Sequence, residues 1–318
     1  TADLFIGAPY AGGAVVSGAC TGNKCGKVYY KSGRDYDFAS ATDTTSSTST
    51  LFDTLSGSSD DGLFGSSMVI GATNWSVGNG SANHLYVGAP GERDGSVEGY
   101  FAMFGVDSSG LLSTQDFNGG NTTREYDKEF ESENRNLFGY SLSIVDSSFG
   151  TNACPCLLVG APGSGVNDNG KLWMYGDVFR AFIEGDNDSD LLGSSIHVGT
   201  IDSIGNNHSI IIGARDSGGG DQKGKFIILR PQSAVGDPET AGLTAESLSY
   251  TPQGALAGEN FGHSISIVEY NSSGDKALIL GAPGEHYTGG SSYQYHRPGI
   301  EHNQKGSVQI ISATKLGF

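Results

Sequence analysis

The amino-acid sequence predicts an all-β fold in which one antiparallel sheet unit is repeated along the chain. Three observations support this prediction: the chain has 50 glycines among 318 residues, its apolar segments are short and bounded by Gly or Pro, and helical periodicity is nearly absent. Glycine at roughly twice its average share of about 7%, without a G-X-Y period, excludes collagen and indicates many tight turns. With 36% hydrophobic residues, the chain can bury a sizeable core.

Three apolar elements recur in the same order. The first is found at residues 63–71, 137–145, 191–199 and 260–268, the second at 4–9, 85–90, 157–162, 210–215 and 278–283, and the third at 26–30, 95–101, 170–175, 224–229 and 306–311. Each element is short and rich in β-branched and aromatic residues, which predicts a strand. A fourth, less regular strand is expected before the next repeat, for instance at residues 129–131, 179–183 or 247–250. Four-stranded sheets repeated every 53 to 81 residues are typical of β-propeller blades.

The repeated residues suggest physical roles. Phenylalanines supply apolar surface for packing one sheet on the next, and the glycines that follow them allow a close backbone approach or a bend. In Gly-Ala-Pro, the small residues fit a crowded end of the sheet and Pro ends the hydrogen-bonded ladder. The phenylalanines are Phe64, Phe138 and Phe261, and the glycines are Gly65, Gly139, Gly193 and Gly262.

This pattern resembles the FG-GAP repeat of integrin α-subunit propellers and related extracellular proteins, and the resemblance covers essentially the whole chain. It implies four antiparallel strands (A to D) per blade, B–C and D–A loops on a ligand-facing side, and A–B loops on the opposite side, where many members bind calcium. The implied function is non-enzymatic recognition or adhesion with a protein or glycan ligand. The alternative is a structural subunit of an extracellular fibre or surface coat, with copies of the chain as partners.

The repeats divide residues 1–318 into a single domain. The chain opens in a second strand and ends where a first strand begins, so either five blades nearly close on themselves or the chain is part of a six- or seven-bladed ring. An unpaired blade edge could accept a strand from a neighbouring chain. The expected blades are residues 1–62 (partial), 63–136, 137–190, 191–259 and 260–315, with residues 316–318 opening the next strand A.

The net charge and the N-glycosylation sequons indicate which classes of partner and which cellular compartment to expect. The net charge of −17 makes nucleic acid an unlikely partner, because a phosphate backbone would be repelled. No stretch approaches the roughly 20 apolar residues that a membrane-spanning helix needs, so direct membrane insertion is not expected. Six N-glycosylation sequons favour a secreted, extracellular or cell-surface glycoprotein; they start at Asn74, Asn79, Asn121, Asn187, Asn207 and Asn271.

The four cysteines are expected to be oxidised in that compartment. The resemblance places Cys20 and Cys25 in a B–C loop and Cys154 and Cys156 in an A–B loop on the opposite side of another blade. A bridge needs Cα atoms within about 7 Å, which favours local pairing. Cys20–Cys25 would staple its loop, whereas Cys154–Cys156 would be strained, and an intermolecular bond is the alternative.

The calcium ligands implied by the resemblance are poorly matched here. A hard cation takes about six to eight oxygens, several of them charged. The nearest match is the A–B loop with Glu269, Asn271, Ser273 and Asp275, in which Ser273 replaces an acid. A second acidic run, residues 184–190, carries three aspartates at alternate positions, and we expect it to be a solvated turn.

Two further segments bear on function. The long B–C loop of the fifth repeat, residues 284–305, carries side chains suited to protein or sugar contacts, or to packing on the loop itself. The segment Gly-His-Ser-Ile-Ser at 262–266 nearly matches a hydrolase nucleophile elbow. Other repeats hold a serine at the same position, so we expect Ser264 to serve the blade and the protein not to be an enzyme. In the loop at residues 284–305, the candidate ligand-binding residues are Tyr287, Tyr293, Tyr295, His296 and Arg297.

Overall fold

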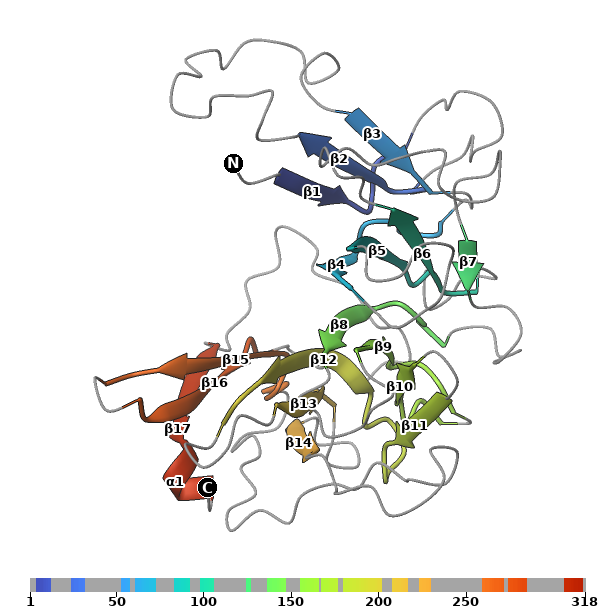
Figure 1. The fold of residues 1–318 in the computed structure, drawn as a ribbon. Helices are drawn as coiled ribbons and strands as arrows, with labels where there is room; N and C mark the ends of the chain where they lie inside the picture. Colours follow the sequence, from blue (N-terminus) through green and yellow to red (C-terminus); the bar gives the residue numbers. More distant parts are fainter. Residues whose placement is uncertain are drawn as a thin grey trace.

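The all-β prediction is confirmed by the computed structural model, in which the strands form five antiparallel sheets in chain order (Figure 1). The structure describes residues 4–12, 24–31, 53–57, 61–72, 83–91, 98–105, 124–126, 136–146, 155–165, 167–176, 180–201, 208–216, 223–229, 259–271, 274–284 and 306–316. Every strand pairs with the strand that precedes or follows it in the sequence, so each sheet is a simple meander.

The sheets are numbered here from the N-terminus. Sheet 1 contains β1 (Leu4–Ala8), β2 (Lys27–Lys31) and β3 (Asp53–Ser56), and sheet 2 contains β4 (Ser67–Gly71), β5 (His84–Ala89), β6 (Tyr100–Gly105) and β7 (Arg124–Tyr126). Sheet 3 contains β8 (Ser141–Val145), β9 (Cys156–Ala161), β10 (Lys171–Tyr175) and β11 (Arg180–Glu184). Sheet 4 contains β12 (Leu192–Gly199), β13 (Ser209–Ala214) and β14 (Lys225–Leu229); sheet 5 contains β15 (Ser264–Glu269), β16 (Lys276–Ala282) and β17 (Ser307–Ser312), followed by helix α1 (Ala313–Leu316).

Several predicted boundaries need correction. In sheets 2, 3 and 5, the Phe-Gly residues form a turn ahead of the first strand, and Leu63 and Gly65 and their repeat equivalents have positive φ, which is not strand geometry. Sheet 4 has the same positive φ values at Leu191 and Gly193, but its first strand begins at Leu192 with an irregular register up to Ser195. The described fourth strand of sheet 2 is Arg124–Tyr126, which the sequence did not predict, whereas that of sheet 3 lies one residue from its predicted place. Residues 129–131 and 247–250 are outside the described residues. Leu316 ends a short helix and does not open a strand.

Both faces of the middle sheets are apolar, and each buries against a neighbour. In β13, Ile210 and Ile212 pack on sheet 3, whereas Ile211 lies on the opposite face and packs towards sheet 5. This follows from the two-residue repeat of a strand. Four hydrophobic clusters of the described residues join sheets 1 and 2, 2 and 3, 3 and 4, and 4 and 5. The predicted packing role of Phe64, Phe138 and Phe261 is confirmed, because each lies in the cluster shared with the preceding sheet.

A repeated polar contact, which we call the junction, accompanies each of three apolar interfaces. A serine at the start of the first strand donates its hydroxyl to the Phe-Gly glycine carbonyl of the next sheet, at 2.7 Å in each case. The Gly-Ala-Pro glycine lies against the same carbonyl, so closely that a Cβ there would overlap it. The glycine is therefore required by the close approach of two backbones. The three serine–glycine pairs are Ser67–Gly139, Ser141–Gly193 and Ser195–Gly262.

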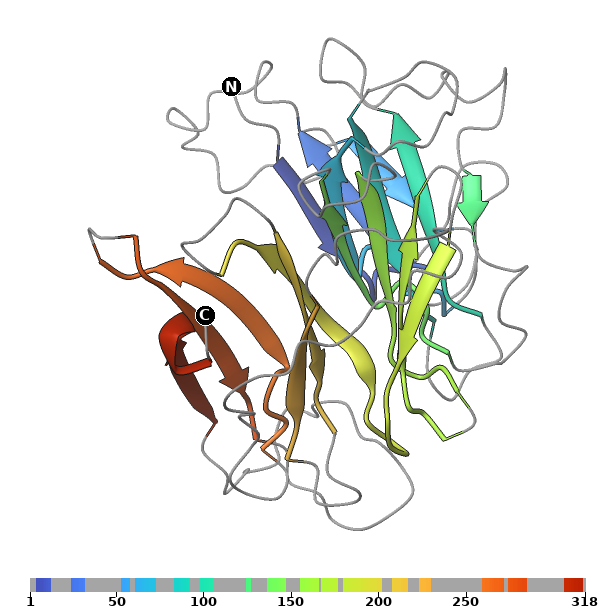
Figure 2. The same ribbon diagram turned by 60° about the horizontal axis from the view of Figure 1, so that its bottom comes forward.

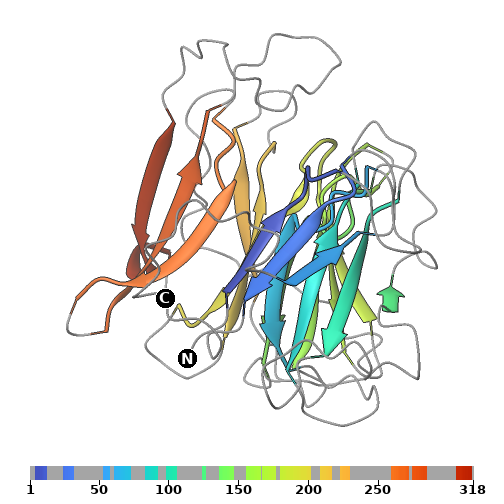
Figure 3. The same cartoon turned by 90° about the horizontal axis from the view of Figure 1, so that it is seen from above.

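The sheets follow one another in a curved succession. In Figure 1, sheet 1 lies at the top, sheet 5 lies at the lower left, and the other three sheets lie along the path between them. Figures 2 and 3 show the same succession from two further directions, with sheet 5 beside sheet 4. None of the four clusters of described residues joins sheet 1 to sheet 5.

Candidate functional site

The second strands of the five sheets end on one side of the stack, which we call the rim. These strands end at Ala8, Ala89, Ala161, Ala214 and Ala282. In sheets 1 to 4, the glycine before this alanine abuts the Phe-Gly turn of the following sheet. Because the same contact recurs at each interface, the second strands run in the same direction. The connections that follow them therefore leave from the rim.

A cluster of buried polar side chains lies at the rim where sheets 3, 4 and 5 meet. Tyr140 immediately precedes β8, Arg215 and Asp216 immediately follow β13, and Asn260 precedes the turn that leads into β15. Arg215, Asp216 and Asn260 are buried despite their polarity. Buried polar groups of this kind need hydrogen-bonded partners.

The Arg215 guanidinium interacts with Tyr140 in two ways. Its Nη1 donates to the phenol oxygen at 3.3 Å, and its central carbon lies 5.7 Å from the ring centroid. A planar guanidinium is suited to combining a hydrogen bond with a cation–π contact. The pair links sheet 3 to sheet 4 across the rim.

Asn260 connects the same segment to sheet 5. With its amide oriented to satisfy its neighbours, Nδ2 donates to Asp216 Oδ1 at 2.8 Å and to the Arg215 carbonyl at 3.2 Å. The rim cluster, defined as Tyr140, Arg215, Asp216 and Asn260, thus fixes three consecutive sheets relative to one another. Its chemistry suits holding the starts of rim connections in place.

The prediction from sequence missed the rim cluster. A signal for it was present, because the fourth repeat reads Gly213-Ala214-Arg215 where the other four repeats have Gly-Ala-Pro. A charged residue in place of a repeated proline indicates a local contact that the other repeats lack. Its partners Tyr140 and Asn260 belong to other sheets, so only the fold brings them together.

The predicted ligand-binding residues lie in the connection after β16. Tyr287, Tyr293, Tyr295, His296 and Arg297 are all outside the described residues. The described end of β16, Ala282, places the start of this connection at the rim. Their role in ligand binding stays a prediction.

The A–B loop predicted as the nearest calcium match is occupied by its own contacts. Asn271 Nδ2 donates to Asp275 Oδ2 at 2.6 Å, and the Asp275 backbone amide donates to Asn271 Oδ1 at 3.0 Å. The Glu269 carboxylate lies 3.7 Å from Lys276 Nζ. Ser273 is outside the described residues. The two described carboxylates are fewer than the several charged ligands that calcium commonly takes, and calcium binding at this loop stays a prediction.

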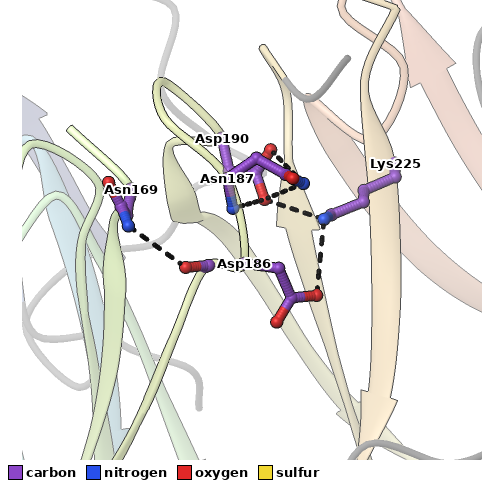
Figure 4. A network of polar contacts seen from close by, with 6 residues as sticks. Asn169, Asp186, Asn187, Asp190 and Lys225 are labelled. Carbon is purple, nitrogen blue, oxygen red and sulfur yellow. Dashed lines mark hydrogen bonds and ion pairs between the residues drawn. The ribbon is translucent and has the colours of Figure 1, made fainter. Parts of the chain in front are cut away.

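The acidic turn at residues 184–190 is only partly the solvated turn that the sequence predicts. Asp186 and Asp188 are exposed, but Asp190 is fully buried. Its carboxylate lies 2.7 Å from Lys225 Nζ of β14 and accepts a hydrogen bond from the Asn187 backbone amide at 3.2 Å (Figure 4). Lys225 also lies 3.9 Å from Asp186. The turn therefore ties the end of sheet 3 to sheet 4 through a buried charge, which needs such a partner.

The described cysteines and sequons agree in part with expectation. Cys25 and Cys156 are buried, and neither is a free thiol; Cys20 and Cys154 lie outside the described residues, so the pairing stays a prediction. Asn187 and Asn271 are exposed in turns. The other sequon asparagines, Asn74, Asn79, Asn121 and Asn207, lie outside the described residues.

The equivalents of Ser264 have a visible structural role. Ser67, Ser141 and Ser195 occupy the same repeat position and donate to the junction carbonyls. Ser264 itself is exposed at the start of β15. The repeated serine therefore serves sheet packing wherever a following sheet is described.

Two comparisons with known proteins found no match. No protein-family model matches the chain, and no curated protein matches it either. Within the described ranges, no three His, Cys, Asp or Glu side chains come together as a metal-binding group. Over the same residues, no helix has the length and apolar character needed to cross a membrane.

Proposed function

We propose that this chain is a non-enzymatic, extracellular β-propeller of the FG-GAP type that mediates recognition or adhesion through the loops at its rim. The observation that carries the proposal is the common direction of the second strands, four of which end in the same glycine contact with the following sheet. Rigid scaffolds of this kind commonly carry binding residues on the loops that leave them.

The rim of sheet 5 is the best place for a ligand. The connection after β16 carries three tyrosines, a histidine and an arginine within residues 287–297. Tyrosine and arginine are enriched where proteins bind one another, because they combine large contact area with hydrogen bonding. A protein or glycan ligand fits this chemistry, and the net charge of −17 disfavours nucleic acid.

The test is a binding screen of the glycosylated chain against a glycan array and a panel of extracellular-matrix proteins. A triple variant, Tyr287→Ala, Tyr293→Ala and Tyr295→Ala, is expected to weaken any specific binding by about tenfold or more. The matched control is Tyr270→Ala, because Tyr270 is exposed in the A–B turn away from the rim. Equal loss in the control, or no loss in the triple variant, would overturn the rim assignment.

The second candidate function is a structural subunit of an extracellular fibre or coat. The exposed apolar residues of the two terminal sheets favour it, because exposed apolar surface marks sites of protein association. Negative-stain imaging separates the two functions: discrete particles support a recognition module, and filaments support a structural subunit.

A further inference from the structure

The third strand of each sheet carries two residues that face the following sheet. In sheets 1 to 4, these residues are buried, and all of them except Tyr30 lie in the cluster shared with the following sheet: Val28 and Tyr30, Phe101 and Met103, Leu172 and Met174, and Phe226 and Ile228. The repeat places Val308 and Ile310 of β17 at the same positions in sheet 5. Val308 is 66% exposed and Ile310 is 69% exposed. Sheet 5 therefore presents an apolar face that is covered in every other sheet.

The second strand shows the converse pattern at the other end of the stack. In sheets 2 to 5, two of its residues are fully buried against the preceding sheet: Leu85 and Val87, Leu157 and Val159, Ile210 and Ile212, and Leu278 and Leu280. The equivalent residues of β1 are Leu4 and Ile6, which are 37% and 44% exposed.

We call Leu4 and Ile6 the head face, and Val308 and Ile310 the tail face. In the four described interfaces, residues equivalent to the tail face pack on the sheet that presents residues equivalent to the head face. One chain therefore carries both halves of a fifth such interface. The halves belong to sheets at opposite ends of the succession, and no described cluster joins them (Figure 1).

We propose that the tail face of one molecule packs on the head face of a second copy of the same chain. Continuity with the four described interfaces supports this pairing. The partner that fits the tail face is a sheet with apolar residues at the second-strand positions, and sheet 1 presents them exposed. Such an interface is heterologous, because the two surfaces differ. Repeated pairing therefore adds copies head to tail, in a ring or in an open filament. This proposal depends on the sheet interfaces and not on any ligand at the rim.

The test uses two variants of the full chain, each with one blocked face. Ile6→Lys blocks the head face and Ile310→Lys blocks the tail face. Light scattering coupled to size-exclusion chromatography is expected to show assemblies of the unaltered chain and monomers of each variant alone. A one-to-one mixture of the two variants is expected to form a dimer and nothing larger, because one intact tail face meets one intact head face.

Controls separate a blocked face from a misfolded chain. Ile70→Lys alters an isoleucine of β4 that is 47% exposed and outside both faces, and it is expected to leave assembly unchanged. The milder pair Ile6→Ser and Ile310→Ser repeats the experiment if a lysine variant unfolds, as judged by circular dichroism. An unaltered chain that stays monomeric at high concentration would overturn the proposal. Folded variants that fail to dimerise on mixing would overturn it too.

Discussion

The interface between sheets 4 and 5 and the uncovered side of sheet 5 use the same repeat residues in different surroundings. At Gly213, an added Cβ would overlap the Gly262 carbonyl of the next sheet and the Ser195 hydroxyl. At Gly281, which has the same place in its repeat, the added Cβ would closely approach only the Ser264 side chain. The same glycine is therefore constrained where the next sheet packs on it and less constrained where no sheet does. The loss of stability on substituting it depends on whether that interface is formed.

The largest expected difference comes from an unpaired buried charge. Lys225→Met removes the ammonium group that faces the fully buried Asp190, and this is expected to lower the free energy of unfolding by about 3 kcal/mol. In sheet 5, Lys276→Met removes a longer, more exposed contact with Glu269, and its cost is expected to stay below about 1 kcal/mol. Urea unfolding of both variants measures the difference. Equal losses would contradict the buried role of Asp190.

The difference in stability between two glycine variants, Gly213→Ala and Gly281→Ala, is expected to be nearly as large. Gly213→Ala forces a methyl group against a fixed backbone carbonyl, which costs about 2 to 3 kcal/mol of unfolding free energy. Gly281→Ala requires only that the Ser264 hydroxyl rotate away, so we expect a cost below about 1 kcal/mol. Thermal unfolding followed by circular dichroism compares the two. In the monomer, a Gly281 variant as unstable as the Gly213 variant would show that another part of the same chain covers this face of sheet 5.

The junction serines give a smaller contrast. Ser195→Ala removes the hydrogen bond to the Gly262 carbonyl and is expected to cost about 1 kcal/mol. Ser264→Ala, made on an exposed serine at the equivalent position, is expected to change stability by less than about 0.5 kcal/mol. Chemical denaturation resolves a difference of this size. A larger loss of stability in Ser264→Ala than in Ser195→Ala would contradict the structural role assigned to the Ser195 hydrogen bond.

The smallest effect is a pH dependence between sheets 4 and 5. The His197 Nε2 accepts a hydrogen bond from the Ile267 backbone amide at 3.2 Å, which requires an unprotonated nitrogen. Burial lowers the pKa of His197 below its ordinary value of about 6.5. The unfolded chain therefore binds more protons near and below that pH, and stability falls as the pH is lowered through this range.

The variant His197→Gln keeps an acceptor but does not titrate. Unfolding free energies at pH 7.5 and at mildly acidic pH are therefore expected to differ less in the variant than in the unaltered chain. An identical pH dependence in both would exclude His197 as a contributor.

The sequence predicts features that recur and misses those that occur once. Five ordered copies of Gly-Ala-Pro or its variant identified the second strands, and residue periodicity assigned their buried faces. The Phe-Gly segments were predicted as strands because their apolar character resembles one, but left-handed backbone at Leu63 and Leu137 makes them turns. Arg215 and Asp190 were missed as buried groups because their partners lie in other sheets.

In this protein, one sheet unit is packed in series through repeated serine–glycine junctions. A crystal structure of the chain tests it most directly. We expect the hydroxyls of Ser67, Ser141 and Ser195 to donate to the carbonyls of Gly139, Gly193 and Gly262, each in the next sheet. Serines that instead point to solvent, between sheets that do not share this contact, would contradict it.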